Sequence, residues 1–143
     1  MKNIKILVLS ICALVFIVSC NNDDDESNSE CDFNTIVDLE LYEEPSPSTY
    51  TIVDAEINGS CLEITIGASG CDGQNWNVNL VSDYPISVMD FASSNISLKL
   101  TNPEICLAYF TNTYSFDISE LTEGLSRFSF MLEGWDSTLE YLN

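Results

Sequence analysis

A hairpin signal near the middle of the chain constrains the fold most strongly. From Thr51 to Ile57, polar and apolar side chains alternate, and the alternation resumes from Leu62 to Ile66. Asn58-Gly59 lies between the two segments, and both residues tolerate the positive φ angles of a tight two-residue turn. We therefore predict an antiparallel pair of strands, with Leu62 and the residues in phase with it on the buried face.

Further segments with a two-residue period follow along the chain, separated by short connections rich in Gly, Pro, Asn and Ser. We expect strands at 37–41, 76–80, 96–100, 106–110, 114–118, 127–133 and 139–141, the fourth of these being the more fully buried. Residues 67–75 are predicted to form a loop, 82–95 to be irregular with a possible extra strand, and 119–124 to form at most one helical turn. No segment has a helical period, and helical crossovers for a parallel sheet are absent. The pattern predicts a single all-β domain over 31–143, an antiparallel immunoglobulin-like sandwich with a small β-barrel as the alternative.

Four cysteines lie in this domain: Cys31, Cys61, Cys71 and Cys106. Their spacings do not fit a zinc site, whereas an exported chain meets an oxidising compartment, so two disulfides are expected. Cys61 begins a strand or faces away from the core, Cys71 lies in a loop, and Cys106 follows a tight turn. We favour Cys31–Cys61 with Cys71–Cys106, although the other two pairings remain open.

The first twenty residues have the pattern of a secretory leader. Lys2 and Lys5 precede an uncharged run, 6–18, that is too short to cross a bilayer as a helix. The sequence Ile-Val-Ser-Cys that ends at Cys20 resembles the lipobox of bacterial lipoproteins. The resemblance implies that residues 1–19 are removed and that Cys20 is acylated, which would anchor the chain in a lipid bilayer. The alternatives are an ordinary signal peptide with an accidental cysteine and an uncleaved anchor.

Polar and acidic residues fill positions 21–30, and such a composition predicts a disordered tether from Cys20 to the domain. The acidic run resembles the surface-export signal of Bacteroidota lipoproteins, which implies the outer membrane and its outer leaflet. A spacer on a periplasmic lipoprotein is the alternative.

The region 50–142, with Cys61-Leu62-Glu63-Ile64 and Gly70-Cys71-Asp72-Gly73, resembles small uncharacterised lipoproteins of Flavobacteria-type bacteria. This likeness implies a location and a fold and no activity.

The charge balance excludes several classes of partner and chemistry. The chain has 4 cations against 23 carboxylates and no histidine, for a net charge of −19 at pH 7. Nucleic acid is not an expected partner, because phosphate binding requires clustered Lys and Arg. Histidine-dependent nucleophiles and metal sites are excluded. A carboxylate-dependent glycoside hydrolase is a remote alternative, and we do not expect an enzyme.

Three features are candidates for a site. Asp72, Gln74 and Asn75 offer oxygen ligands for Ca²⁺, although their spacing is not that of an EF-hand and the same residues are good turn formers. Trp135 with Asp136 lies in a turn and could contact a glycan or a protein, whereas Trp76 is expected in the core. The triplet Asp136-Ser137-Thr138 resembles the three-residue O-glycosylation pattern of Bacteroidota exported proteins, with Ser137 as the candidate residue. We expect no cofactor, and a membrane-anchored binding module for a protein or glycan ligand, with a structural envelope lipoprotein as the alternative.

Overall fold

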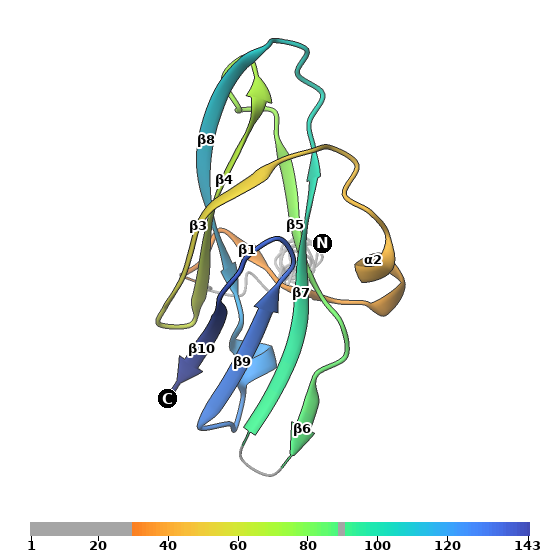
Figure 1. The fold of residues 1–143 in the computed structure, drawn as a ribbon. Helices are drawn as coiled ribbons and strands as arrows, with labels where there is room; N and C mark the ends of the chain where they lie inside the picture. Colours follow the sequence, from red (N-terminus) through yellow and green to blue (C-terminus); the bar gives the residue numbers. More distant parts are fainter. Residues whose placement is uncertain (1–29, 89–90) are drawn as a thin grey trace, which may run out of the picture.

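The computed structural model describes residues 30–88 and 91–143 and shows two β-sheets packed face to face (Figure 1). The leader, Cys20 and the tether up to residue 29 lie outside the described residues. In chain order the elements are β1 (Phe33–Asn34), β2 (Ile36–Val37), α2 (Leu39–Glu43), β3 (Thr51–Asn58), β4 (Cys61–Gly70), β5 (Asn77–Ser82), β6 (Ile86–Val88), β7 (Phe91–Thr101), β8 (Ala108–Asp117), α3 (Ser119–Thr122), β9 (Arg127–Leu132) and β10 (Thr138–Leu142).

One sheet has the strand order β1-β8-β4-β3, and the other has the order β10-β9-β7-β5-β2, with β6 alongside β7. The predicted all-β sandwich is confirmed, and the sheets do not close into the alternative barrel. The pairing is not antiparallel throughout, because β1–β8, β2–β5 and β7–β9 are parallel. The chain passes from β7 to β9 through β8 in the opposite sheet, so this parallel pair needs no helical crossover.

The predicted hairpin is present, with β3 and β4 joined through a turn at Gly59, whose φ is +61°. A register shift between Ile52 and Asp54 interrupts the alternation in β3. Ile52 is therefore partly buried, and Val53 is 50% exposed, opposite to the faces that simple alternation predicts. A bulge of this kind adds a residue to one strand and exchanges the faces beyond it.

The core lies between the two sheets and consists of aliphatic and aromatic side chains from both. From β4, Leu62, Ile64 and Ile66 are fully buried, as predicted. The six-stranded sheet supplies Leu80, Ile96, Leu98, Leu100, Phe128 and Phe130, all with no exposed surface. Trp76, also predicted to lie in the core, is 7% exposed.

The predicted strand at 37–41 and the two predicted strands between 106 and 118 differ from the structure. The strand expected at 37–41 is instead β2 followed by the helix α2, whose N-cap Asp38 accepts a hydrogen bond from the Leu41 amide at 2.9 Å. A capping carboxylate favours helix at this point over the strand that alternation indicates. The strands expected at 106–110 and 114–118 form one long strand, β8, which begins only at Ala108.

The remaining expectations concern loops and cross-links. Strand β4 continues to Gly70, so the loop predicted at 67–75 is shorter than expected, and α3 is the single helical turn predicted after β8. Both favoured disulfides are present: Cys31–Cys61 and Cys71–Cys106, with Cα–Cα distances of 5.7 and 4.8 Å. Across residues 30–88 and 91–143, no helix has the length and apolarity needed to span a membrane.

Candidate functional site

Two loops meet at one end of the sandwich and form what we call the tip: residues 71–76, which link β4 to β5, and residues 102–107, which link β7 to β8. Both lie at the upper end of the molecule in Figure 1. The Cys71–Cys106 disulfide joins the two loops. A cross-link between connections that are distant in sequence limits the motion of both.

The Glu104 side chain, in the second loop of the tip, accepts hydrogen bonds from the first loop and holds the two together. Its Oε2 accepts hydrogen bonds from the backbone amides of Cys71, Asp72 and Gly73 at 2.6, 3.2 and 3.0 Å, and its Oε1 accepts one from the Asn75 amide at 3.2 Å. Such converging amides form an anion-binding nest. Desolvation is the largest single influence on the Glu104 carboxyl and raises its pKa, but the four amides together outweigh it and lower the pKa from 4.5 to about 2.

Asparagine side chains brace the same loops on both sides. Asn102 Nδ2 donates to the Ser69 carbonyl at 2.7 Å, and Asn102 Oδ1 accepts from the Glu104 amide at 2.9 Å. On β8, Asn112 Nδ2 donates to the Gly73 carbonyl at 3.0 Å. The tip is therefore held by a disulfide, a filled amide nest and three side-chain hydrogen bonds.

This rigid loop presents two apolar side chains to solvent. Ile105 is 91% exposed and Leu107 is 94% exposed, and they flank Cys106 in the sequence. Tyr109, 59% exposed, follows on β8, and its ring covers Gly67, where an added Cβ would overlap the phenol. The prediction of a more fully buried strand at 106–110 is wrong, because residues 106–109 are exposed and only Phe110 is partly buried and packs against the core.

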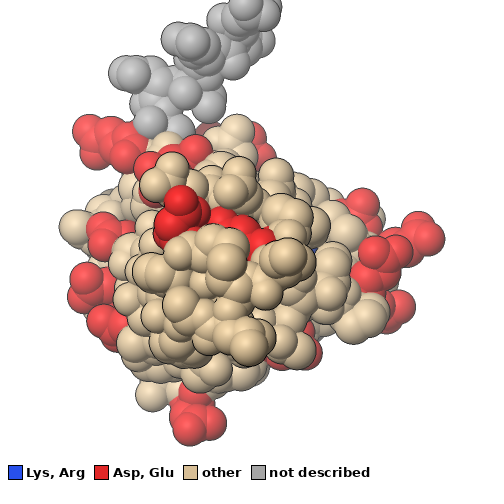
Figure 2. Space-filling model, turned by 90° about the horizontal axis from the view of Figure 1, so that it is seen from above, with Lys and Arg blue, Asp and Glu red and all other residues tan. Residues whose placement is uncertain are grey.

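The surroundings of the tip carry little positive charge. Figure 2 looks down on this end and shows uncharged surface around a small acidic patch, with more acidic side chains at the rim and almost no basic surface. Outside the leader, the sequence contains only Lys99 and Arg127 as cations. Lys99 is 6% exposed, and Arg127 pairs with Glu140 at 2.7 Å.

The residues predicted to bind Ca²⁺ lie in the first loop of the tip. Asp72 Oδ1 accepts a hydrogen bond from the Gln74 amide at 3.0 Å, and Asn75 Nδ2 donates to Glu104 Oε1 at 3.4 Å. The loop thus directs N–H donors inward at a carboxylate, an arrangement suited to an anion. Within the described residues, no three His, Cys, Asp or Glu side chains form a metal-binding group. The observed contacts favour the turn-forming interpretation of these residues.

Trp135, Asp136 and Ser137 lie in the turn between β9 and β10. Trp135 is partly buried and packs against the core, and no hydrogen-bond partner for its shielded Nε1 occurs in the part of the chain that the structure describes. Its ring is therefore not fully exposed, and a ligand contact through Trp135 stays a prediction. Asp136 and Ser137 are exposed, and glycosylation of Ser137 stays a prediction.

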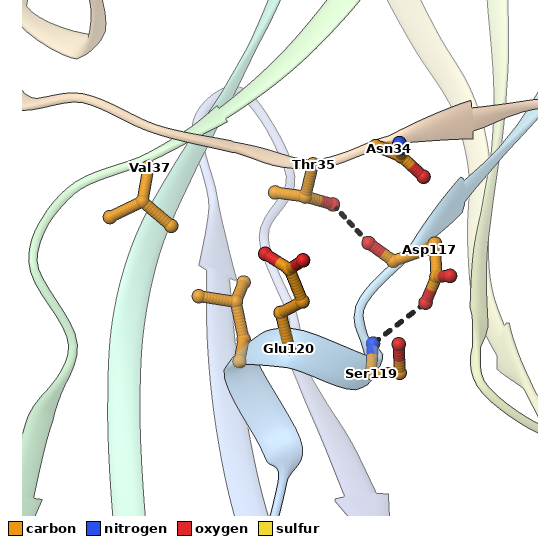
Figure 3. Close-up of a pocket in the computed structure, with 7 residues that line it drawn as sticks. Asn34, Thr35, Val37, Asp117, Ser119 and Glu120 are labelled. Carbon is orange, nitrogen blue, oxygen red and sulfur yellow. Dashed lines mark hydrogen bonds between the residues drawn. The ribbon is translucent and has the colours of Figure 1, made fainter. Parts of the chain in front are cut away.

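A small pocket of about 130 Å³ lies beside α3 and is lined by Asn34, Thr35, Val37, Asp117, Ser119, Glu120 and Leu121 (Figure 3). Asp117 Oδ1 accepts from the Ser119 amide at 2.8 Å, and the Asp117 carbonyl accepts from Thr35 Oγ1 at 2.7 Å. In Figure 3 the Asp117 carboxylate is turned toward the start of α3, and that of Glu120 toward Thr35. The two carboxylates are thus directed at different neighbours within the pocket.

No protein-family model matches this chain, and no curated protein matches it either. A NigD-like immunity protein from Bacteroides caccae superposes with a TM-score of 0.53 at 9% identity, over 77% of this chain and 64% of that one. A protein of unknown function from Bacteroides vulgatus gives a TM-score of 0.48 at 14% identity, over 78% of this chain and 56% of that one. The chain thus spans less than two thirds of either structure, and the likeness to the first is one of fold.

The sequence predicted the cross-linked loops but not the exposed apolar pair. Leu107 falls in the strand predicted at 106–110 to be the more fully buried, whereas Ile105 lies between the predicted turn and that strand and has no predicted side. Counting back in steps of two from Ser115, which lies on the outward side of β8 opposite Glu63, assigns both to the solvent side. This two-residue alternation was the sequence signal that could have identified the exposed apolar pair.

Proposed function

We propose that this protein is a lipid-anchored envelope lipoprotein and that its sandwich is a protein-binding module with the tip as binding element. The sequence supports the anchor, through the lipobox-like segment that ends at Cys20 and the polar tether that follows it. The observation that carries the binding role is the exposure of Ile105 and Leu107 on a loop that is already fixed.

Energetics favour a binding role for this pair. Burying a Leu or Ile side chain completely is worth roughly 1.5–3 kcal/mol, and side chains of this kind serve as anchors when they enter a pocket. Because the disulfide and the Glu104 nest already order the loop, binding would cost little additional backbone entropy. Exposed apolar residues on a flexible loop would lose much of this advantage.

The expected partner is a protein with an apolar cleft and a neutral or basic rim. The tip offers apolar side chains on a face whose charged groups are almost all acidic, so a basic rim would complement it and an acidic rim would be repelled (Figure 2). Trp135, the aromatic residue considered for glycan contacts, is partly buried against the core, which favours a protein over a glycan.

The position of the tip suits a tethered binder. Cys31, where the tether ends, is bonded to Cys61 at the start of β4, and the tip begins just beyond Gly70 at the other end of that strand. Ten strand residues span about 33 Å. The acidic tether favours an outer-membrane position on the cell surface, with the periplasmic side as the alternative.

A position-specific cross-linking experiment tests the binding role. A photoreactive amino acid replaces Leu107 in the lipoprotein on intact cells, and in a second strain it replaces Leu142, which is 68% exposed at the far end of β10. We expect a discrete protein adduct from position 107 and none from position 142. Identical patterns from both positions, or no adduct from position 107, would contradict the proposal and leave a structural envelope lipoprotein.

Protease treatment of intact and lysed cells tests the location. We expect the domain to be degraded on intact cells, and we expect Cys20→Ala to release it from the membrane fraction. Protection until lysis would place it in the periplasm. If Cys20→Ala stayed in the membrane fraction, the anchor would be wrong. The B. caccae structure is named an immunity protein. Immunity is one form of protein binding, and we would test this chain for it once an adduct is identified.

A further inference from the structure

The two disulfides lie at opposite ends of the same strand. Cys61 is the first residue of β4, and Cys71 follows its last residue, Gly70. The first bond leads to Cys31, where the tether enters, and the second leads to Cys106, between the two apolar residues of the tip. We infer that the domain is built to carry mechanical tension from its anchor to a partner bound at the tip, an inference that rests on the proposed function.

The disulfides shorten the load path. Cys31 and Cys106 are 75 positions apart in the sequence, and a chain of that length reaches about 270 Å when fully extended. With both bonds in place, force that enters at Cys31 crosses to Cys61, runs along β4 to Cys71 and crosses to Cys106. The polypeptide in that path is about ten residues long and already extended, at about 33 Å.

All other elements lie outside this path. The first disulfide closes a loop of 30 positions that contains β1, β2, α2 and β3, and the second closes a loop of 35 positions that contains β5, β6 and β7. Strands β8, β9 and β10 follow Cys106 toward the C-terminus. Pulling on the tip therefore loads covalent bonds and one strand, and it applies no direct force to the packing between the sheets.

The loaded strand is also well supported. In the four-stranded sheet β4 lies between β3 and β8, and it pairs with β8 along its whole length, from Cys61↔Asp117 to Gly70↔Ala108. Tension along the axis of a strand that is already extended does not shear it past its neighbours, because those neighbours are not held at their own ends. The sheet should stay folded while the strand is under load.

Single-molecule force spectroscopy on the mature chain tests the inference. One handle is attached at position 20 and the other at position 107 through a clickable amino acid in place of Leu107. We expect no unfolding step in the oxidised protein. In the Cys31→Ser/Cys61→Ser variant the load path includes residues 31–71, so we expect a lengthening of roughly 110 Å. A step of that size in the oxidised wild-type protein would overturn the inference.

A second pulling direction provides the matched control. With handles at positions 20 and 143, residues 107–143 lie in the load path of the oxidised protein, and an unfolding step of roughly 100 Å is expected. An oxidised protein that resists equally in both directions would also overturn the inference, because the resistance would then not follow the disulfide path. The experiment needs no partner, so its failure is distinguishable from a failure of the cross-linking at position 107.

Discussion

At the scale of single residues, the Glu104 carboxylate stabilises the folded conformation of the tip. The carboxylate is hydrogen-bonded to four backbone amides, and its pKa is about 2, below the ordinary value of 4.5. A group whose pKa is lower in the folded chain stabilises the fold fully above its unfolded pKa. This contribution is lost as the pH falls from about 4.5 through about 2.

We therefore predict that Glu104→Gln lowers the free energy of unfolding at neutral pH and flattens its decline between about pH 4.5 and pH 2. The glutamine has no charge to attract the amides and turns an NH₂ group toward some of them. Urea unfolding at a series of pH values measures both effects. Glu123→Gln, at an exposed position on the short connection after α3, should keep the wild-type decline. An unchanged acid limb in Glu104→Gln would show that the nest does not stabilise the fold.

Tyr50 gives the corresponding effect at alkaline pH. Burial, and second the nearby Glu133 carboxylate, raise the pKa of its hydroxyl to about 12, and the hydroxyl donates to the Leu98 carbonyl at 2.6 Å. A raised pKa stabilises the fold below pH 10, and this contribution is lost as the pH rises toward 12. We predict that Tyr50→Phe costs about 1 kcal/mol at pH 7 and weakens the loss of stability between pH 10 and 12. Urea unfolding measures the free energy of unfolding of both proteins over this range. If both lost the same amount between pH 10 and 12, the effect would not come from Tyr50.

At the scale of elements, the helix α2 depends on a buried lysine from strand β7. Lys99 on β7 is 6% exposed, and its Nζ donates to the carbonyls of Tyr42, at 2.8 Å, and Glu44. These are carbonyls at the C-terminal end of a five-residue helix, where a positive charge is favourable. Asp38 caps the other end, so side chains satisfy both ends of a helix that is too short to be stable alone.

We predict that Lys99→Met destabilises the protein by roughly 1–3 kcal/mol, because two carbonyl oxygens lose their donor. The Tyr42 amide, which donates to Asp38 within the helix, should exchange with solvent faster, whereas amides in β4 should be less affected. Hydrogen exchange with urea unfolding measures both. Arg127→Met removes an exposed ion pair and should cost about 0–1 kcal/mol. Equal costs for the two variants would contradict a role for Lys99 at the helix end.

The same scale shows what the sequence could and could not predict. Alternation and the Asn58-Gly59 turn identified the hairpin and most strands, because burial on one face of a sheet leaves a two-residue period. Alternation misled at Val53, where a bulge exchanges the faces, and at 39–41, where the Asp38 cap and the distant Lys99 stabilise a helix. For the tip, the sequence identified the cysteines and turn residues, but the Glu104 nest depends on loops about 30 positions apart.

At the scale of the whole molecule, the disulfides contribute much of the stability. The two loops that they close, of 30 and 35 positions, do not overlap. In the chain-entropy description, loops of this length are worth about 3.7 kcal/mol each. The sum is about 7 kcal/mol, which is comparable to the roughly 5–15 kcal/mol that stabilise a typical domain.

Because the closed loops share no residue, the effects of removing the two bonds should be nearly additive. We predict losses of about 2–4 kcal/mol for Cys31→Ser/Cys61→Ser and for Cys71→Ser/Cys106→Ser, and a combined variant at or near the limit of folding. Urea unfolding of the four proteins measures the cycle, and reduction of the wild type should reproduce the combined variant. If the combined variant lost no more than the weaker pair, the two bonds would constrain one common unfolded state, and β4 would not separate two independent loops.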